Sequence, residues 1–511
     1  MSTPMVNLDG HSLTLAQLES LAFARAQARL SPAARDAMTV SRRAIEEAAS
    51  GTAPVYGVNT GFGELASVRV DASHLDELQI NLVRSHCAGV GPPLAAEQVR
   101  ASMALRANTL ARGHSGIRPE TVETLLAILN AGAYPLVPSQ GSVGASGDLA
   151  PLAHIALALT GEGTMMRAGQ PRPAVIILRE IGVEPVRLGA KEGLALINGT
   201  QVSTSLGSLA LLEAERLVDI ADIAGAAALE GLKGSVRPFD PRIQEIRGHP
   251  GQAVVAEHIR KLTAGSTIGE SHRECGRVQD SYALRCIPQV HGAVRDAEDF
   301  IRSVLEIEVN ATTDNPVVFA ESGEMLSCGN FHGAPVAYAL DLLAIVMTDL
   351  GSISERRIDR MVNPRLSGLP PFLAPDAGLN SGFMLAQVTA AALASENKTL
   401  AHPASVDSIP TSANKEDHVS MSTWSARKAL AVIDNTRRIL AIELLVAAQA
   451  LDLLEPLTPG SGVAAVHRAI RQRVPFLTAD RVLTPDISMV EVLIRDGHIA
   501  RAAAEATHSP A

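Results

Sequence analysis

The chain has 511 residues, of which 46% are hydrophobic and 19% are charged. Such a chain can bury a large core, so an intrinsically disordered protein is excluded. The 44 basic and 54 acidic side chains leave a net charge of −10, and only 3% of residues are aromatic. These values argue against a nucleic-acid binder, which would neutralise phosphates with basic side chains or stack bases on aromatic rings.

The sequence gives no sign of export or of a membrane anchor. The residues after Met1 include neither a basic stretch nor the apolar run of a secretory signal. The longest uncharged helical stretch, residues 378–395, contains Asn380, Ser381 and Gln387, which favour a buried helix over a membrane span. The four cysteines are too few for a disulfide scaffold. We expect a cytoplasmic protein with neither a membrane nor a nucleic acid as partner.

In chain order, apolar residues recur mostly at the spacing of helices. A first such segment contains Val99, Met103 and Leu110 and is followed by Gly113. Further helices are predicted at residues 119–132, 150–160, 203–230, 289–308, 334–360, 380–398 and 420–454. Strand signals are few. The best is the apolar run at residues 174–178, and Val55 and Val68 lie in expected short hairpins.

These elements predict a mainly α fold with two parts. A mixed N-terminal region, residues 1–202, is followed by an elongated bundle of long helices, residues 203–511. No period of 20 to 50 residues recurs, which excludes a solenoid. Several C-terminal helices are apolar nearly all round and need cover on every side. A bundle shared between subunits would provide that cover, so we expect an oligomer.

A glycine-rich segment at residues 141–149 reads Gly-Ser-Val-Gly-Ala-Ser-Gly-Asp-Leu and precedes a predicted helix. One interpretation is a flexible turn in which Asp148 caps that helix. A phosphate-binding loop fits poorly, because no Gly-Lys-Ser/Thr follows and the glycine spacing is GxxGxxG. A nucleophile elbow around Ser146 also fails, because the final glycine of GxSxG is missing.

A fourth interpretation is that Ala145, Ser146 and Gly147 cyclise. These residues are small enough for the amide nitrogen of Gly147 to attack the carbonyl carbon of Ala145. Loss of one water closes a five-membered ring, and loss of the Ser146 hydroxyl as a second water leaves an exocyclic methylidene. The product, 4-methylidene-imidazol-5-one, is an electrophile built from the chain itself, so no external cofactor is required.

Six ordered blocks spread over most of the chain carry a resemblance to a known family. They are YGVNTGFG at 56–63, NGTQ at 198–201, QDSYALRC at 279–286, TDNP at 313–316, GNFHG at 329–333 and DHVSM at 417–421. Together with the tripeptide they resemble the aromatic amino acid ammonia-lyase family. The resemblance implies an architecture like that of histidase and fumarase, and a homotetramer with shared active sites. It also implies a carbon–nitrogen lyase that removes ammonia from an L-amino acid.

The resemblance assigns catalytic roles to residues of the tripeptide and to two tyrosines. The ring of Ala145, Ser146 and Gly147 would take the substrate amine covalently and activate it for departure. Tyr282 matches the family position that takes the β-proton, which requires the site to favour its phenolate. Tyr56 matches a second tyrosine held close to the ring and the amine. For Asp148, beside the ring, assistance to ring formation and capping of the helix both stay open.

Four further residues match substrate-binding positions of the family. Arg285 matches the residue that grips the substrate carboxylate, for which a planar guanidinium is suited. Asn198 and Gln279 could hold the carboxylate and the ring oxygen without adding charge. Phe331 matches a position beside the ring, where simple core packing is the alternative.

Two residues resemble the histidine-specific form of the family. His86, in the pair Ser85-His86, can donate or accept a hydrogen bond towards an imidazole. Glu416 matches an acidic position near the substrate imidazole, whereas phenylalanine would leave that carboxylate buried and unpaired. We therefore expect deamination of L-histidine to trans-urocanate. Arg84 and Lys415 are similar to residues of some tyrosine enzymes, so a tyrosine ammonia-lyase or tyrosine 2,3-aminomutase is the alternative.

A third hypothesis, from another class, is a helical assembly protein that has kept the fold and lost the chemistry. The presence of Tyr56, Ser146, Tyr282 and Arg285 argues against it. A metal site at His402 and His418 is not expected, because the chain has no HExxH motif and no closely spaced His/Cys set.

Overall fold

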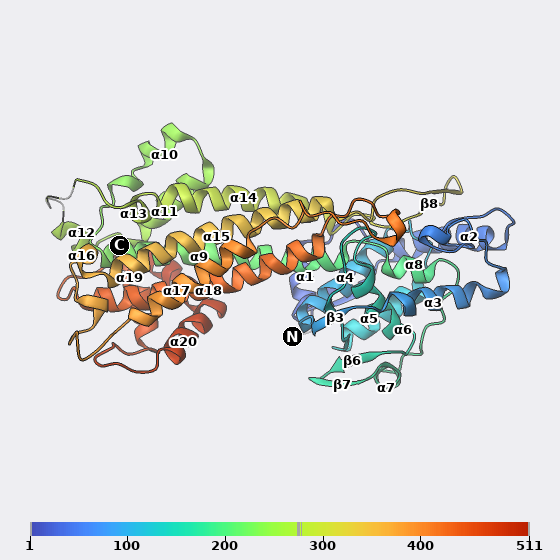
Figure 1. Ribbon diagram of the computed structural model, residues 1–511, viewed down its shortest axis with the longest axis horizontal. Helices are drawn as coiled ribbons and strands as arrows, with labels where there is room; N and C mark the ends of the chain where they lie inside the picture. The colour runs from blue at the N-terminus through green and yellow to red at the C-terminus, as the bar shows by residue number, and fades with distance from the viewer. Residues whose placement is uncertain (1–2, 273–275, 277, 509–511) are drawn as a thin grey trace. The chain divides into compact units, whose positions relative to one another are not determined.

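The computed structural model describes residues 3–272, 276 and 278–508 (Figure 1). Its residues group into two compact units. Unit 1 contains residues 1–210, 302–341 and 403–427, and unit 2 contains 211–301, 342–402 and 428–511. Because these units group residues by contact and neither is one continuous stretch, the division of the chain at residue 202 stays a prediction.

Four long helices have residues in both units. They are α9 (Gln201–Gly231), α14 (Ile287–Glu308), α15 (Ala334–Val362) and α18 (Ser422–Asp452). Each confirms a helix predicted from apolar spacing, to within a few residues at either end. Their interiors contain no proline beyond the first turn, so the backbone hydrogen bonds continue without interruption.

Unit 1 combines helices with small sheets. Its helices are α1 (Leu15–Ala22), α2 (Pro32–Ser50), α3 (Leu75–His86), α4 (Ala96–Ala111), α5 (Pro119–Asn130), α6 (Leu149–Leu159), α7 (Ala174–Glu180) and α8 (Glu192–Ile197). Its strands are β1 (Met5–Leu8), β2 (Gln27–Leu30), β3 (Val90–Pro93), β4 (Tyr134–Pro135), β5 (Pro138–Gln140), β6 (Thr164–Arg167), β7 (Gln170–Pro173), β8 (Val317–Phe319) and β9 (Glu324–Leu326). Strands β1 and β2 pair in parallel, while β3–β5, β4–β6–β7 and β8–β9 are antiparallel.

Unit 2 is helical. Besides its parts of the long helices, it contains α10 (Pro241–Arg247), α11 (Pro250–Leu262), α12 (Thr267–Ser271), α13 (Tyr282–Arg285), α16 (Pro364–Ser367), α17 (Met384–Leu400), α19 (Ser461–Arg471), α20 (Thr484–Arg495) and α21 (His498–His508). Among the described residues, the fold is therefore mainly α, as the sequence predicts.

Buried ionisable side chains join the long helices inside unit 2. His291 on α14 binds Asp222 on α9 at 2.7 Å, and Arg357 on α15 forms an ion pair with Glu443 on α18. All four side chains are fully buried. Burial of a charge is costly unless it is paired, so these contacts restrict which helix faces can meet.

The strand predicted at residues 174–178 is wrong, because these residues form helix α7. Ala174, Ile177 and Leu178 are buried, whereas Val175 and Ile176 are 39% and 37% exposed. The buried positions follow the i, i+3, i+4 spacing of a helix. A short apolar run does not distinguish this pattern from a buried strand.

The hairpins expected around Val55 and Val68 also differ from the structure. This region forms turns, with one isolated antiparallel bridge between Thr60 and Arg69. The side chain of Asn59 accepts a hydrogen bond of 2.7 Å from the amide of Val55, and this local bond closes a turn in place of a strand pair.

Among the described helices, only α15 has the length and hydropathy of a membrane span, and 61% of its apolar window is buried within the protein. A core helix meets the same criteria. The stretch at residues 378–395, the candidate from the sequence, overlaps α17, which buries Ala386, Ala390 and Ala394.

Candidate active site

A cavity of about 410 Å³ in unit 1 brings together most of the predicted site residues. It is lined by Tyr56, His86, Ala145, Ser146, Asn198, Phe331 and Glu416, among others. They come from helix ends and loops, where side chains can converge on one space while the helices fix their positions.

The tripeptide lies against the turn Asn198–Gly199. Gly147 has a φ of +72°, and a side chain there would place its Cβ 2.2 Å from the carbonyl oxygen of Gly199. Only glycine fits such an approach. The side-chain amide of Asn198 donates a hydrogen bond of 2.9 Å to the carbonyl oxygen of Ser146.

Arg106 supports this turn from the protein interior. Its guanidinium donates to the carbonyl oxygens of Asn198 and Ala195 at 2.9 and 2.5 Å, and to the side chain of Gln201 at 2.6 Å. Complete burial lowers the pKa of Arg106 to about 10, which still leaves the side chain charged at neutral pH. The position of Asn198 is thus fixed by a buried cation.

Asp148 is wholly buried and does not cap the helix that follows it. Its carboxylate instead accepts hydrogen bonds from the amide and hydroxyl of Ser203 in the first turn of α9, at 2.7 and 3.0 Å. The hydroxyls of Thr423 and Ser142 donate to its other oxygen at 2.5 and 3.2 Å. Burial raises the pKa of Asp148, although these hydrogen bonds oppose the shift.

Glu416 faces the tripeptide. The hydroxyl of Ser146 donates to its Oε1 at 2.6 Å, and the hydroxyls of Thr411 and Ser412 donate to its Oε2 at 2.5 and 3.0 Å. Partial burial acts to raise the pKa of Glu416, but the hydrogen bonds outweigh it and the pKa lies below its ordinary value. Glu416 is therefore a carboxylate at neutral pH.

His86 ends helix α3 as a neutral side chain. Its Nδ1 lies 2.8 Å from the carbonyl oxygen of Leu82. A carbonyl only accepts, so Nδ1 carries the proton and Nε2 is left as an acceptor. Burial lowers the pKa of His86, although the bond to Leu82 and the charge of Glu416 act in the opposite direction.

Tyr56 is a neutral phenol beside these groups. Its ring packs edge-on against Phe62, with centroids 6.3 Å apart, and its oxygen accepts a hydrogen bond of 3.4 Å from the amide of Gly63. Burial raises the pKa of Tyr56, and the charge of Glu416 adds to the shift.

Gln279, Tyr282 and Arg285 belong to unit 2 and do not line this cavity. They form a set of their own. The guanidinium of Arg285 lies 4.6 Å from the centre of the Tyr282 ring and donates a hydrogen bond to Gln279. Tyr282 is 70% exposed. The predicted site residues thus fall into two sets, one in each unit.

The cavity is also lined by residues that are not among the predicted site residues. They include Phe62, Asn315, His332, Lys415 and His418. The rings of His332 and His418 stack, with centroids 5.8 Å apart and planes at 3°. Both histidines occur in the sequence blocks that carry the family resemblance, which is the signal that could have found them.

Arg84 lies outside the cavity lining. Its guanidinium forms an ion pair with Glu162, with a shortest distance of 2.7 Å. The similarity of Arg84 to residues of some tyrosine enzymes therefore does not bear on this cavity, whereas Lys415 does line it.

Among the described residues, Asp219, Asp222 and His258 have the spacing of metal ligands. The carboxylate of Asp222, however, already binds His258, His291 and Arg295 at 2.6 to 3.0 Å. An arginine in contact with the carboxylate supplies the positive charge that a cation would bring.

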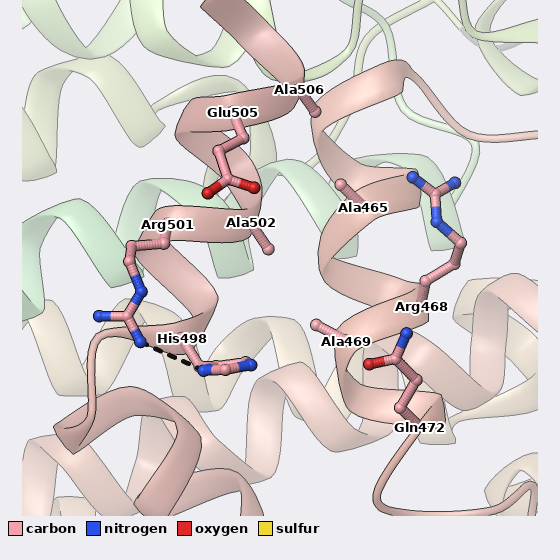
Figure 2. A pocket seen from close by; sticks show the side chains of 9 residues that line it. All are labelled: Ala465, Arg468, Ala469, Gln472, His498, Arg501, Ala502, Glu505 and Ala506. Atoms are coloured by element: carbon pink, nitrogen blue, oxygen red, sulfur yellow. Dashed lines mark hydrogen bonds between the residues drawn. The ribbon is translucent and has the colours of Figure 1, made fainter.

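A second cavity, of about 440 Å³, lies between α19 and α21 of unit 2 (Figure 2). Alanines of the two helices face each other across it, and Arg501 binds His498 at 3.2 Å on its edge. None of the predicted site residues lines it.

Comparison with known proteins identifies the class. The family model for aromatic amino acid lyases matches residues 13–472, and the chain belongs to this family. The members that resemble this chain are carbon–nitrogen lyases and related enzymes. The protein is therefore an enzyme that acts on an amino acid.

Individual relatives show which enzymes of the family this chain resembles. A histidine ammonia-lyase of Anaeromyxobacter sp. (strain K) is 57% identical over 96% of this chain and 98% of its own. The crystal structure of histidine ammonia-lyase from Trypanosoma cruzi matches with a TM-score of 0.91 and 45% identity, over 98% of this chain and 95% of that one. A tyrosine aminomutase from Streptomyces globisporus matches with a TM-score of 0.93 and 42% identity, over 99% of both chains.

Proposed function

We propose that the protein is a histidine ammonia-lyase, which converts L-histidine to trans-urocanate and ammonia in the cytoplasm. The observation that carries this proposal is the 2.6 Å hydrogen bond between Ser146 and Glu416. It brings an acidic group suited to an imidazole into the same cavity as the tripeptide that can become an electrophile. The identity to histidine ammonia-lyases over nearly the whole chain supports the same substrate.

We infer that Ala145, Ser146 and Gly147 form the 4-methylidene-imidazol-5-one ring, with loss of two waters. The surroundings fit this group. The carbonyl oxygen of Ser146 would become the ring oxygen, and Asn198 already donates a hydrogen bond to it. Gly147 fits against Gly199 only without a side chain. When formed, the ring supplies an electrophilic carbon that takes the substrate amine.

The other side chains of the cavity bind and orient the substrate in this proposal. Glu416 is ionised at neutral pH and can accept a hydrogen bond from an imidazole N–H. His86 offers its Nε2 as a second acceptor. Phe331 packs beside the substrate, and Tyr56 is held near its amine as a neutral phenol.

We infer further that Gln279, Tyr282 and Arg285 of another copy of the chain complete the site in a homotetramer. Tyr282 would take the β-proton, Arg285 would bind the substrate carboxylate, and Gln279 would add a neutral hydrogen bond. The exposure of Tyr282 supports this assignment, because a base that abstracts a proton from carbon must be shielded from bulk water.

The decisive experiment supplies the purified protein with L-histidine and L-tyrosine separately and follows urocanate, coumarate and β-tyrosine. Release of urocanate alone is the expected result. Products from tyrosine alone would favour the tyrosine alternative, for which the match to the Streptomyces globisporus aminomutase and the position of Lys415 at the cavity give a reason. An intact mass lower than that of the sequence by two waters is expected in either case.

A further inference from the structure

Glu416 lies on a strained turn, residues 411–418. Ser412, Ala413 and Asn414 have φ values of 53°, 54° and 65°, in the left-handed region that residues other than glycine rarely adopt. Three such residues in succession persist only where surrounding contacts hold the turn in place.

Part of this support comes from within the turn. Thr411 and Glu416 form an antiparallel bridge, and the hydroxyls of Thr411 and Ser412 bind the Oε2 of Glu416. These contacts shape the turn but do not fix it against the rest of unit 1. The bond from Ser146 does so, yet its hydroxyl is lost if the ring forms. Just beyond the turn, the hydroxyl of Ser420 and the amide of Met421 donate to the carbonyl oxygens of Gly144 and Val143, both at 2.8 Å.

His332 holds the other end of the turn. Its Nδ1 lies 3.3 Å from the backbone amide of Ala334, which only donates, so the proton of the ring is on Nε2. That Nε2 lies 3.1 Å from the carbonyl oxygen of His418, which only accepts. Nε2–H therefore donates to the end of the turn.

The segment that carries His332 is itself joined to the reactive loop. The amide of Gly333 donates a hydrogen bond of 3.2 Å to the carbonyl oxygen of Gly144, next to the tripeptide. A Cβ on Gly333 would lie 2.4 Å from the hydroxyl of Ser422, so this segment packs closely. Through this segment, His332 links the turn that carries Glu416 to the loop that carries Ser146.

We propose that His332 is a positioning residue for Glu416, because its hydrogen bond to the carbonyl of His418 holds the strained turn against the tripeptide loop. This inference rests on the proposed role of Glu416 in binding the substrate imidazole. His332 does not touch the substrate in this proposal. It holds the backbone of the turn, and the turn positions the carboxylate of Glu416 in the cavity.

Two substitutions of His332, each of which introduces a carboxamide, test its hydrogen bond to the carbonyl oxygen of His418. In His332→Gln the amide nitrogen occupies roughly the place of Nε2 and can still donate to His418. In His332→Asn the amide is shorter by one methylene, occupies the place of Nδ1 and cannot reach. We expect His332→Asn to raise the KM for L-histidine by about threefold to tenfold, the range for loss of one hydrogen bond, with a smaller change in kcat. His332→Gln should restore most of the KM.

Two further measurements separate positioning from a general loss of structure. In a double-mutant cycle, His332→Asn should raise the KM much less in the Glu416→Gln background than in the wild type. Both substitutions weaken the same contact, the one between Glu416 and the substrate imidazole. Additive effects of the two substitutions in this cycle would overturn the inference.

Hydrogen exchange of the amides in residues 408–421 gives a result that does not depend on activity. Faster exchange in His332→Asn than in His332→Gln is expected, and equal exchange in both contradicts the role of the bond. If the wild-type protein does not act on L-histidine, the proposed function fails while the exchange experiment still decides whether His332 holds the turn.

Discussion

The side-chain amide of Asn198 donates a hydrogen bond of 2.9 Å to the carbonyl oxygen of Ser146. In the proposed ring this oxygen is conjugated with the electrophilic methylidene, so a donor at that position withdraws electron density from the reacting carbon. We expect Asn198→Ala to lower kcat by about 10²-fold, the order found when one preorganised donor is removed. Steady-state kinetics with L-histidine measure this loss. The intact mass of the variant should still be lower by two waters, since a full mass would mean that Asn198 acts in ring formation instead.

Ser146→Ala removes the hydroxyl whose loss creates the methylidene. The variant should show the full mass expected from its sequence and almost no turnover. Ser327 lines the same cavity and provides a matched control, because Ser327→Ala removes a hydroxyl without touching the tripeptide. This control should keep both the lowered mass and most of the activity. Full activity in Ser146→Ala would refute the electrophile.

Glu416→Gln replaces the carboxylate by a neutral amide of the same size. Turnover of L-histidine should fall far more than any turnover of L-tyrosine, which has no imidazole to bind. The pKa of Glu416 lies below the ordinary value of 4.5, so the carboxylate is present at neutral pH and is lost only as pH falls through that lowered pKa. Histidine binding by the wild type should therefore weaken at the acidic end of a pH series. Equal losses for both substrates would remove Glu416 from the selectivity argument.

The assignment of the site to more than one subunit can be tested with two inactive variants. Ser146→Ala disables the set in unit 1, and Tyr282→Phe disables the set in unit 2. If each site combines one set from each of two chains, co-expression and random assortment should restore about a quarter of the sites. Mixing the separately purified variants without subunit exchange is the control. No recovered activity in mixed oligomers would place both sets of one site in a single chain.

Glu298 on α14 is buried, and its Oε1 has no hydrogen-bond partner among the described residues. Burial, with the nearby acidic charge of Glu215, raises the pKa of Glu298 to about 9. The folded protein thus holds this proton more tightly than the unfolded chain, and stability contributed by the neutral form is lost as pH rises towards 9. Glu298→Gln should raise the free energy of unfolding by about 1–3 kcal/mol at alkaline pH. Thermal melts at pH 5 and pH 8.5 measure the difference, and an equal effect at both would contradict it.

The long helices could be predicted from the sequence because their apolar spacing extends over many turns. The interval from residue 203 to 230 predicts α9 almost to its ends. The run at 174–178 is too short for its spacing to separate a strand from a helix, and the packing of Ile177 and Leu178 decides for the helix.

Several residues of the cavity could be predicted from sequence blocks, but their contacts could not. Asp148 precedes helix α6, so a cap on that helix was the natural alternative, yet its carboxylate binds the first turn of α9 instead. That contact joins residues 55 positions apart in the chain, and no local pattern encodes it. His332 was likewise present in a block, while its bond to the turn of Glu416 depends on tertiary structure.

Ser146 and Glu416 are separated by 270 positions, and Asp148 binds Thr423 from the same distant segment. During translation, the ribosome must have synthesised residues 411–423 before the tripeptide can acquire these neighbours. Any maturation step that depends on these neighbours can therefore occur only in the late stages of synthesis. If ring formation is such a step, a shorter nascent chain would carry the tripeptide as ordinary peptide.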